Sequence, residues 1–191
     1  MKEIILASAS PRRFDLLRQI GLRFSVMPSN MEETINLRLD AYQIAESLAS
    51  QKAFHVSESL RGDFLVIGAD TIVVKEGILG KPENEDHAFE MLSMLRGQWH
   101  EVITGIAVVD STSKRVMSGY EKTRVKMREL SDENLWAYIR TGEPMDKAGS
   151  YGIQGMGALL VEKIEGCYFN VVGLPLTKLW SMLEPMGVQI L

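Results

Sequence analysis

Stretches with strand-like and helical hydrophobic spacing alternate along most of the chain. Apolar or alternating runs predict strands at 4–7, 23–27, 64–67, 72–74, 102–109, 116–127 and 158–164. Apolar positions at helical spacing predict helices that begin after Ser10, Asp40, Asn84, Ser131 and Pro175. This alternation predicts an α/β fold with a mixed sheet.

The first predicted strand is followed by a short polar loop and a helix start. Residues 8–10 are small, and Pro11 suits the first helical position because its fixed φ fits there. A helix N-terminus attracts anions. Arg12 and Arg13 lie in the first turn, where the helix dipole disfavours cations, so a bound phosphate would account for them. A solvated helix start with a serine cap is the alternative.

Length, charge and cysteine content limit the class of protein. A chain of 191 residues makes one large domain or two small lobes that share a sheet. The net charge of −4 argues against a long basic surface for a nucleic acid polymer. No apolar run approaches the ~20 residues of a membrane span. The single cysteine, Cys167, cannot form an internal disulfide, and no signal peptide is evident, so we expect a reducing cytoplasm.

Two charged residues occupy positions where the pattern expects apolar ones. Lys52 lies three helical turns beyond Ala41, along the apolar stripe of the second helix. It either extends to the rim of the core or reaches an anion. Asp70 separates the apolar runs at 64–67 and 72–74, and a buried carboxylate needs a cation, a metal or a substrate proton. A buried salt bridge is the alternative to a functional role.

Two further loops present polar side chains. Lys81 precedes Pro82, which holds it extended, so the lysine projects from a constrained loop. The segment 147–157 contains four glycines within nine residues, which permits close approach of a ligand to the backbone. In it, Gln154 carries a donor and an acceptor that suit the edge of a nucleobase. Glycine-rich turns are common, so this pattern alone is weak.

The candidate chemistry is hydrolysis of a phosphoanhydride. The three histidines show no zinc-ligand spacing, so a metal would be Mg²⁺ or Mn²⁺ held by Glu32, Glu33 and Asp70 with substrate phosphates. No lysine has the P-loop spacing, and nothing indicates a Ser–His–acid triad. Cys167 as a nucleophile is a weaker hypothesis than a buried thiol. The cations would bind phosphates while one carboxylate activates water.

Four ordered motifs identify a family. They are Ala7–Arg13, Gly68–Thr71, Gly80–Pro82 and Asp146–Gly155. Together they resemble the Maf family of nucleoside triphosphate pyrophosphatases over essentially the whole chain. The resemblance implies a single domain over 1–191, an elongated α/β fold whose twisted mixed sheet has flanking helices. It also implies two lobes around a cleft, similar to inosine triphosphate pyrophosphatase. Members cleave the α–β phosphoanhydride, release the monophosphate and pyrophosphate, and need a divalent cation.

The resemblance also implies roles for individual residues. Asp70 resembles the acid that activates water, and Lys52 and Lys81 resemble phosphate-handling catalytic groups. Phosphate contacts are implied for Ser8, Arg12 and Arg13. Glu33 resembles the acidic group beside the metal, with Glu32 as a second candidate, and Asp70 could also bind the metal.

The motifs resemble the dTTP/UTP pyrophosphatase subgroup in particular. Another subgroup has Trp at the position of Arg12 and prefers 7-methyl-GTP. A glutamine amide can complement O4 and N3–H of uracil or thymine together. We therefore expect Arg12, Thr71 and Gln154 to set a pyrimidine preference, with Gln154 facing the base.

Two other functions compete with an enzyme. The family is linked to arrest of septum formation, so a regulatory module could sense a nucleotide without turnover. A purely structural α/β domain is the third hypothesis. A homodimer is expected by resemblance only.

Overall fold

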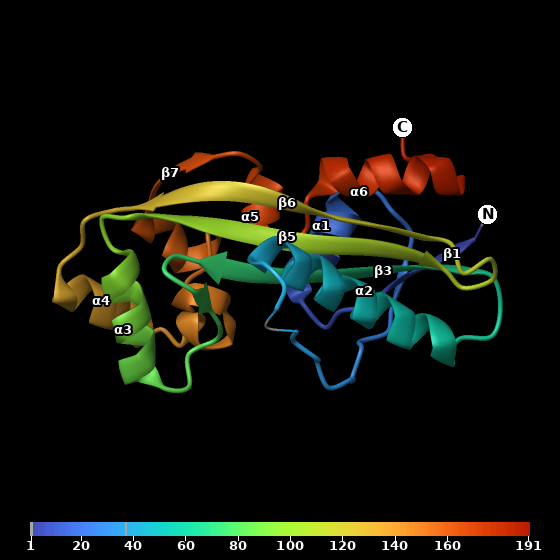
Figure 1. Cartoon of the computed structure of the whole chain (residues 1–191). Helices are drawn as coiled ribbons and strands as arrows, with labels where there is room; N and C mark the ends of the chain where they lie inside the picture. The colour runs from blue at the N-terminus through green and yellow to red at the C-terminus, as the bar shows by residue number, and fades with distance from the viewer. Residues whose placement is uncertain (1, 37) are drawn as a thin grey trace. The chain divides into compact units, whose positions relative to one another are not determined.

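The computed structural model describes residues 2–36 and 38–191, in which strands and helices alternate (Figure 1). The strands are β1 (Glu3–Leu6), β2 (Ser25–Val26), β3 (Phe64–Val74), β4 (Ile78–Leu79), β5 (Trp99–Asp110), β6 (Val116–Met127) and β7 (Val161–Glu165). The helices are α1 (Pro11–Gln19), α2 (Ala41–Ser59), α3 (Glu85–Leu95), α4 (Asp132–Ile139), α5 (Tyr168–Val172) and α6 (Leu176–Leu183). Short 3₁₀ turns are η1 (Glu143–Asp146), η2 (Ala148–Ser150), η3 (Gly155–Leu160) and η4 (Glu184–Met186).

In the part of the chain that is described, the strands form one mixed sheet in the order β2-β1-β3-β5-β6-β7, and β4 pairs with β3. β1 runs parallel to both β2 and β3, with Ile5 opposite Ser25 and Val66. β3–β4 and β6–β7 are antiparallel pairs. The predicted α/β class with a mixed sheet and flanking helices is therefore confirmed.

The chain divides into two units. The first contains the residues up to Asp70, together with Thr104–Glu121 and Gly173–Leu191. The second contains Thr71–Ile103 and Lys122–Val172. The assignment of 1–191 to one domain with two lobes stays a prediction.

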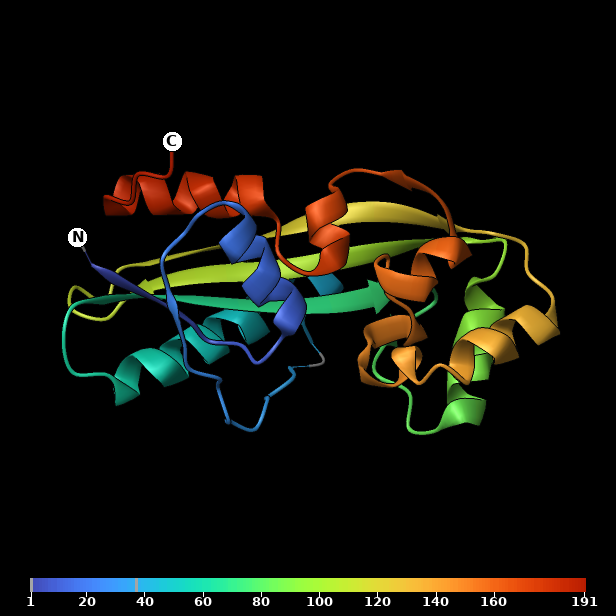
Figure 2. The same ribbon diagram turned by 180° about the vertical axis from the view of Figure 1, so that it is seen from behind.

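In the first unit, α2 covers one face of the strands and α1 lies on the other, as the two opposite views show (Figures 1 and 2). The core under α2 is built from small and β-branched side chains of α2, β1, β3 and β5, including Ala49, Ala53, Val66 and Ala107. Small residues allow the helix to approach the sheet closely. Asp40 is the N-cap of α2, and its carboxylate accepts from the backbone N–H of Gln43 in a capping box.

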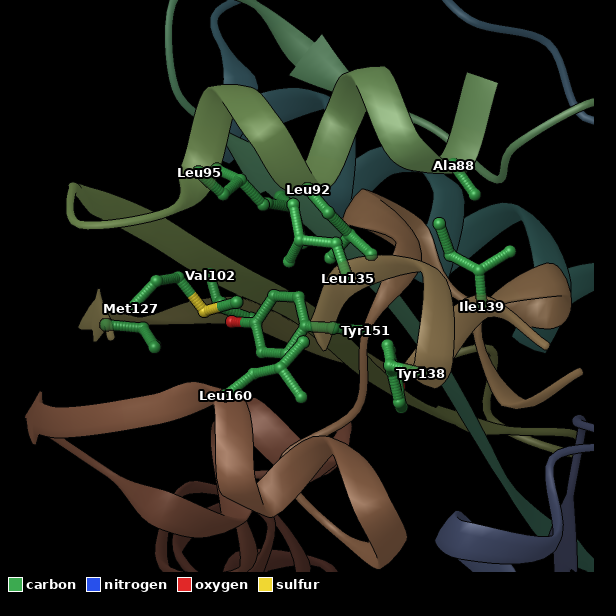
Figure 3. Packing of buried hydrophobic residues seen from close by; sticks show 12 residues of the cluster. Ala88, Leu92, Leu95, Val102, Met127, Leu135, Tyr138, Ile139, Tyr151 and Leu160 are labelled. Atoms are coloured by element: carbon green, nitrogen blue, oxygen red, sulfur yellow. The ribbon is translucent and has the colours of Figure 1, made fainter. Parts of the chain in front are cut away.

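In the second unit, α3 and α4 lie side by side, with Phe89 stacked on Trp136 at a centroid distance of 4.8 Å. The buried ring of Tyr151 lies among Val102, Met127 and Leu160 (Figure 3). This core anchors the glycine-rich segment 147–157, because Tyr151 belongs to that segment.

Several local predictions were wrong. β3 is one unbroken strand through Asp70, where a break between two runs was expected. β2 has only two residues, residues 158–160 form the end of η3 rather than a strand, and β4 and α5 were not predicted. Over the described ranges, no helix has both the length and the apolar character of a membrane span.

Candidate functional site

The loop between β1 and α1 is organised by Ser8. Its Oγ accepts hydrogen bonds from the backbone N–H of Ser10 at 3.2 Å and from Nη1 of Arg13 at 3.1 Å. Nε of Arg13 donates to the carbonyl oxygen of Gly173 at 2.8 Å. The side chain of Ser10, the N-cap of α1, makes no cap hydrogen bond, and Pro11 follows it. The guanidinium is therefore held beside the positive end of α1, an arrangement that favours an anionic ligand.

A three-member ion cluster lies in the same unit. Nζ of Lys52, on α2, contacts Oε1 of Glu33 at 2.8 Å and also pairs with Oδ1 of Asp70 on β3. The side chains of Lys52 and Asp70 are 15% and 14% exposed, whereas Glu33 is 45% exposed. Lys52 thus reaches an anion, and Asp70 has the salt bridge that was the alternative to a functional role.

The close approach of α2 to β3 makes this pairing reachable. A Cβ added at Gly68 would lie less than 3.0 Å from the carbonyl oxygen of Ala49 and from Ala53 on α2. Gly68 stands two residues before Asp70, and Lys52 stands beside Ala53. Glycine at position 68 therefore lets α2 pack closely against β3 next to the contact between Lys52 and Asp70.

The arginines at the start of α1 and the ion cluster of Lys52 interact electrostatically. Burial lowers the pKa of the Arg13 guanidinium, and Arg12 adds to this effect, while Asp70 and Glu33 oppose it. An arginine remains protonated under such perturbation. The first unit therefore gathers Arg13 and Lys52 near the carboxylates of Asp70 and Glu33, and Arg12 acts on Arg13. Such a set of charges can bind a polyanion.

The second unit holds Thr71, Lys81 and Gln154. Thr71 follows Asp70 on β3 and is half-buried, while Lys81 and Gln154 are exposed on loops. The backbone N–H of Gly149 donates to the carbonyl oxygen of Gly80 at 3.0 Å, which ties the Lys81 loop to the glycine-rich segment. Local backbone contacts therefore bring these two loops together.

The glycines of 147–157 accommodate the protein's own groups. A Cβ at Gly149 would meet Val73, one at Gly152 would meet Lys147, and one at Gly155 would meet Glu143. One at Gly157 would approach the carbonyl oxygen of Gly152 and the hydroxyl of Tyr138. The expected reason for these glycines was close approach of a ligand, and the structure gives internal packing as a reason.

Among the candidate carboxylates, the ion cluster includes Glu33 and Asp70. Glu32 is exposed. Within residues 2–36 and 38–191 no group of three or more His, Cys, Asp and Glu side chains is placed to hold a metal. Mg²⁺ is commonly bound through one or two carboxylates together with substrate phosphates and water. Two carboxylates that converge on one ammonium fit that mode of binding.

Sequence reasoning missed Glu143 and the buried pair His100–Tyr151. Glu143 accepts backbone hydrogen bonds from residues 13 and 14 positions further on. Nε2 of His100 lies 2.6 Å from the Tyr151 hydroxyl, and burial lowers the pKa of His100 to about 4. These contacts have no characteristic spacing. The available signal was the glycine pattern. It indicates that the backbone is crowded there, but it does not identify the side chains that crowd it.

The fold places the chain in a known structural class. It is similar to the Ham1 protein of Staphylococcus aureus, with a TM-score of 0.53 over 97% of this chain and 100% of that one, at 14% identity. The Maf-like protein family model matches residues 3–186, so the chain belongs to the Maf family.

Relatives in that family are similar over the full chain. A dTTP/UTP pyrophosphatase of Acetivibrio thermocellus is 50% identical over 100% of this chain and 98% of its own length. A dTTP/UTP pyrophosphatase of Alkaliphilus oremlandii is 56% identical over 96% of each.

Proposed function

We propose that this chain is a nucleoside triphosphate pyrophosphatase that hydrolyses dTTP and UTP to the nucleoside monophosphate and pyrophosphate. The observation that carries the proposal is the cluster in which Lys52 joins Glu33 and Asp70 in the unit that also holds Arg13 and Ser8. Relatives 50% and 56% identical to this chain are named dTTP/UTP pyrophosphatases, which supports the same substrates here.

The phosphates are assigned to the cations. Arg12 and Arg13 follow the N-terminal end of α1, and Arg binds phosphate oxygens through its planar fork. Ser8, which already orients Arg13, supplies a hydroxyl, and Lys52 and Lys81 supply ammonium groups. When a phosphate approaches, Lys52 can exchange part of its contact with Glu33 for the substrate, because Glu33 is the more exposed partner.

Asp70 is assigned to the attacking water. An ionised carboxylate accepts a proton from water as the water oxygen bonds to phosphorus, and the bridging oxygen between the α- and β-phosphates leaves with pyrophosphate. The Asp70 carboxylate pairs with the Lys52 ammonium. Glu33 and Asp70, with Glu32 as a further candidate, would hold Mg²⁺ or Mn²⁺, which neutralises charge on the phosphates when it is bound.

Pyrimidine preference is assigned to Gln154, with Thr71 and Arg12 as further contributors. The Gln154 amide is exposed and offers a donor and an acceptor together. A site that pairs both groups with one base rejects another base strongly, because a mismatch leaves polar groups unpaired. A cytoplasmic location and a homodimer stay predictions.

Base selection can be tested with Gln154→Ala. Initial rates with dTTP, UTP, dCTP, dATP and dGTP give kcat/KM for each nucleotide. We expect kcat/KM for dTTP and UTP to fall by about 5- to 150-fold, with smaller changes for the others, as one lost base contact costs about 1–3 kcal/mol. Gln19→Ala is the matched control, because Gln19 is an exposed residue of α1. An unchanged order of substrates in Gln154→Ala would remove the role of Gln154.

A further inference from the structure

Gln154 begins a 3₁₀ turn and has an exposed side chain. It is the N-cap of η3, a position at which Ser, Thr, Asp or Asn usually accepts a hydrogen bond from the first turn. Here it makes no cap hydrogen bond and stays exposed. The N–H groups of the first turn are then left to another acceptor or to water.

That acceptor is Glu143, from η1. Its Oε2 accepts from the backbone N–H of Met156 at 2.9 Å, and its Oε1 accepts from that of Gly157 at 3.0 Å. The Tyr138 hydroxyl donates to the same Oε1 at 2.9 Å. One carboxylate therefore caps η3 from outside, in place of the residue that begins the turn.

Glycines in the segment admit this carboxylate. Gly155 has φ = 67°, and a Cβ there would lie 2.7 Å from Oε2 of Glu143. A Cβ at Gly157 would lie 3.1 Å from Oε1 of Glu143 and 2.8 Å from the Tyr138 hydroxyl. The backbone on the C-terminal side of Gln154 is thus built around the Glu143 carboxylate.

We propose that Glu143 is a positioning residue that fixes the backbone at Gln154, so that the Gln154 amide is free to select the base. The inference rests on the proposed role of Gln154 in pyrimidine binding. Glu143 takes over the cap, which leaves the Gln154 side chain available, and it holds the backbone at Met156 and Gly157. Glu143 itself does not contact substrate.

The electrostatics of the carboxylate agree with this geometry. Desolvation acts to raise the pKa of Glu143, but the N–H groups of Gly157 and Met156 and the Tyr138 hydroxyl outweigh it, and the pKa is lowered. The ionised form is therefore the one that holds the turn.

The test combines Glu143→Gln with Gln154→Ala in a double-mutant cycle. The glutamine amide that replaces the Glu143 carboxylate would keep one acceptor and direct an N–H group at a backbone N–H. We expect selectivity for dTTP over dCTP to fall about tenfold, mainly through a higher KM for dTTP, with kcat changed less than about threefold. Because Glu143 acts through Gln154, the double variant should have the selectivity of Gln154→Ala alone.

Two further variants separate positioning from a general loss of structure. Glu162→Gln makes the same change at an exposed position of β7 and should leave selectivity unchanged. Tyr138→Phe removes one donor to Glu143 and should lower selectivity less than Glu143→Gln, which keeps the test open if the latter folds poorly.

The outcomes distinguish this inference from the proposed function. Unchanged selectivity in soluble Glu143→Gln and Tyr138→Phe, or independent losses in the double variant, would overturn the positioning role while wild-type turnover still stands. Absence of pyrophosphate release by the wild type from every nucleotide would instead overturn the proposed function and this inference together.

Discussion

Lys52→Met is expected to lower the free energy of unfolding, because it removes the cation of the ion cluster. Methionine keeps the apolar stem and removes the ammonium, which leaves the Asp70 carboxylate, 14% exposed, without that partner. Breaking a buried ion pair costs about 3–5 kcal/mol, and breaking an exposed one costs about 0–1 kcal/mol. For a pair at 15% and 14% exposure we expect about 3 kcal/mol. Glu33 adds little, because it is 45% exposed.

Thermal unfolding followed by circular dichroism measures this loss. For a chain of this size, about 3 kcal/mol lowers Tm by about 6–12 °C. Lys52→Met/Asp70→Asn should recover most of the loss, since the neutral amide is cheaper to bury than a lone carboxylate. Both variants should lack pyrophosphatase activity, because both lack Lys52, and the double variant recovers stability alone.

The control is Lys163→Met on β7, which removes an exposed ion pair with Glu165. It should change stability by less than about 1 kcal/mol. A loss in Lys52→Met no larger than in Lys163→Met would refute the reasoning. So would further destabilisation when Asp70→Asn is added.

Two other changes test the packing and the buried titratable group. Gly68→Ala should lower the free energy of unfolding, measured by denaturant titration, by about 3 kcal/mol or more, because the methyl group would press on the backbone of α2 at Ala49. The control Gly77→Ala, whose Cβ would have no atom near it, should lower it by less than about 1 kcal/mol. Burial lowers the pKa of His100 from 6.5 to about 4. As the pH falls, the unfolded chain therefore binds a proton at this histidine before the folded chain does. The contribution of His100 to the free energy of unfolding is complete above pH 6.5 and declines as the pH falls toward 4. His100→Gln should therefore show a flatter fall of Tm between pH 6.5 and 4 than wild type, and equal slopes would contradict this assignment.

The regular elements were largely predictable because their signals are local. The caps at Asp40, Asn84 and Ser131 each accept the expected backbone hydrogen bond. The unbroken β3 was not predictable, because the partner that lets a strand carry Asp70 is Lys52, 18 residues earlier. Short elements such as β4 have too few residues for a period to be visible.

The candidate site was predictable as residue types and motifs, and its contacts were not. The sequence indicated cations at the start of α1 and two charged residues, Lys52 and Asp70, in apolar surroundings. It did not indicate that Arg13 is held by the carbonyl oxygen of Gly173, 160 residues away. Nor did it indicate Glu143, since a carboxylate that binds backbone N–H groups leaves no pattern of side chains.

The most direct measurement is the identity of the products formed from dTTP by wild type and by Asp70→Asn. Reactions with Mg²⁺ or Mn²⁺, and with chelator, are resolved by ³¹P NMR. The proposed function predicts dTMP and pyrophosphate in equal amounts from wild type with metal, and a loss of several orders of magnitude in Asp70→Asn. Release of dTDP and phosphate, or full activity in Asp70→Asn, would contradict it. Nucleotide binding without any product would favour the regulatory module instead.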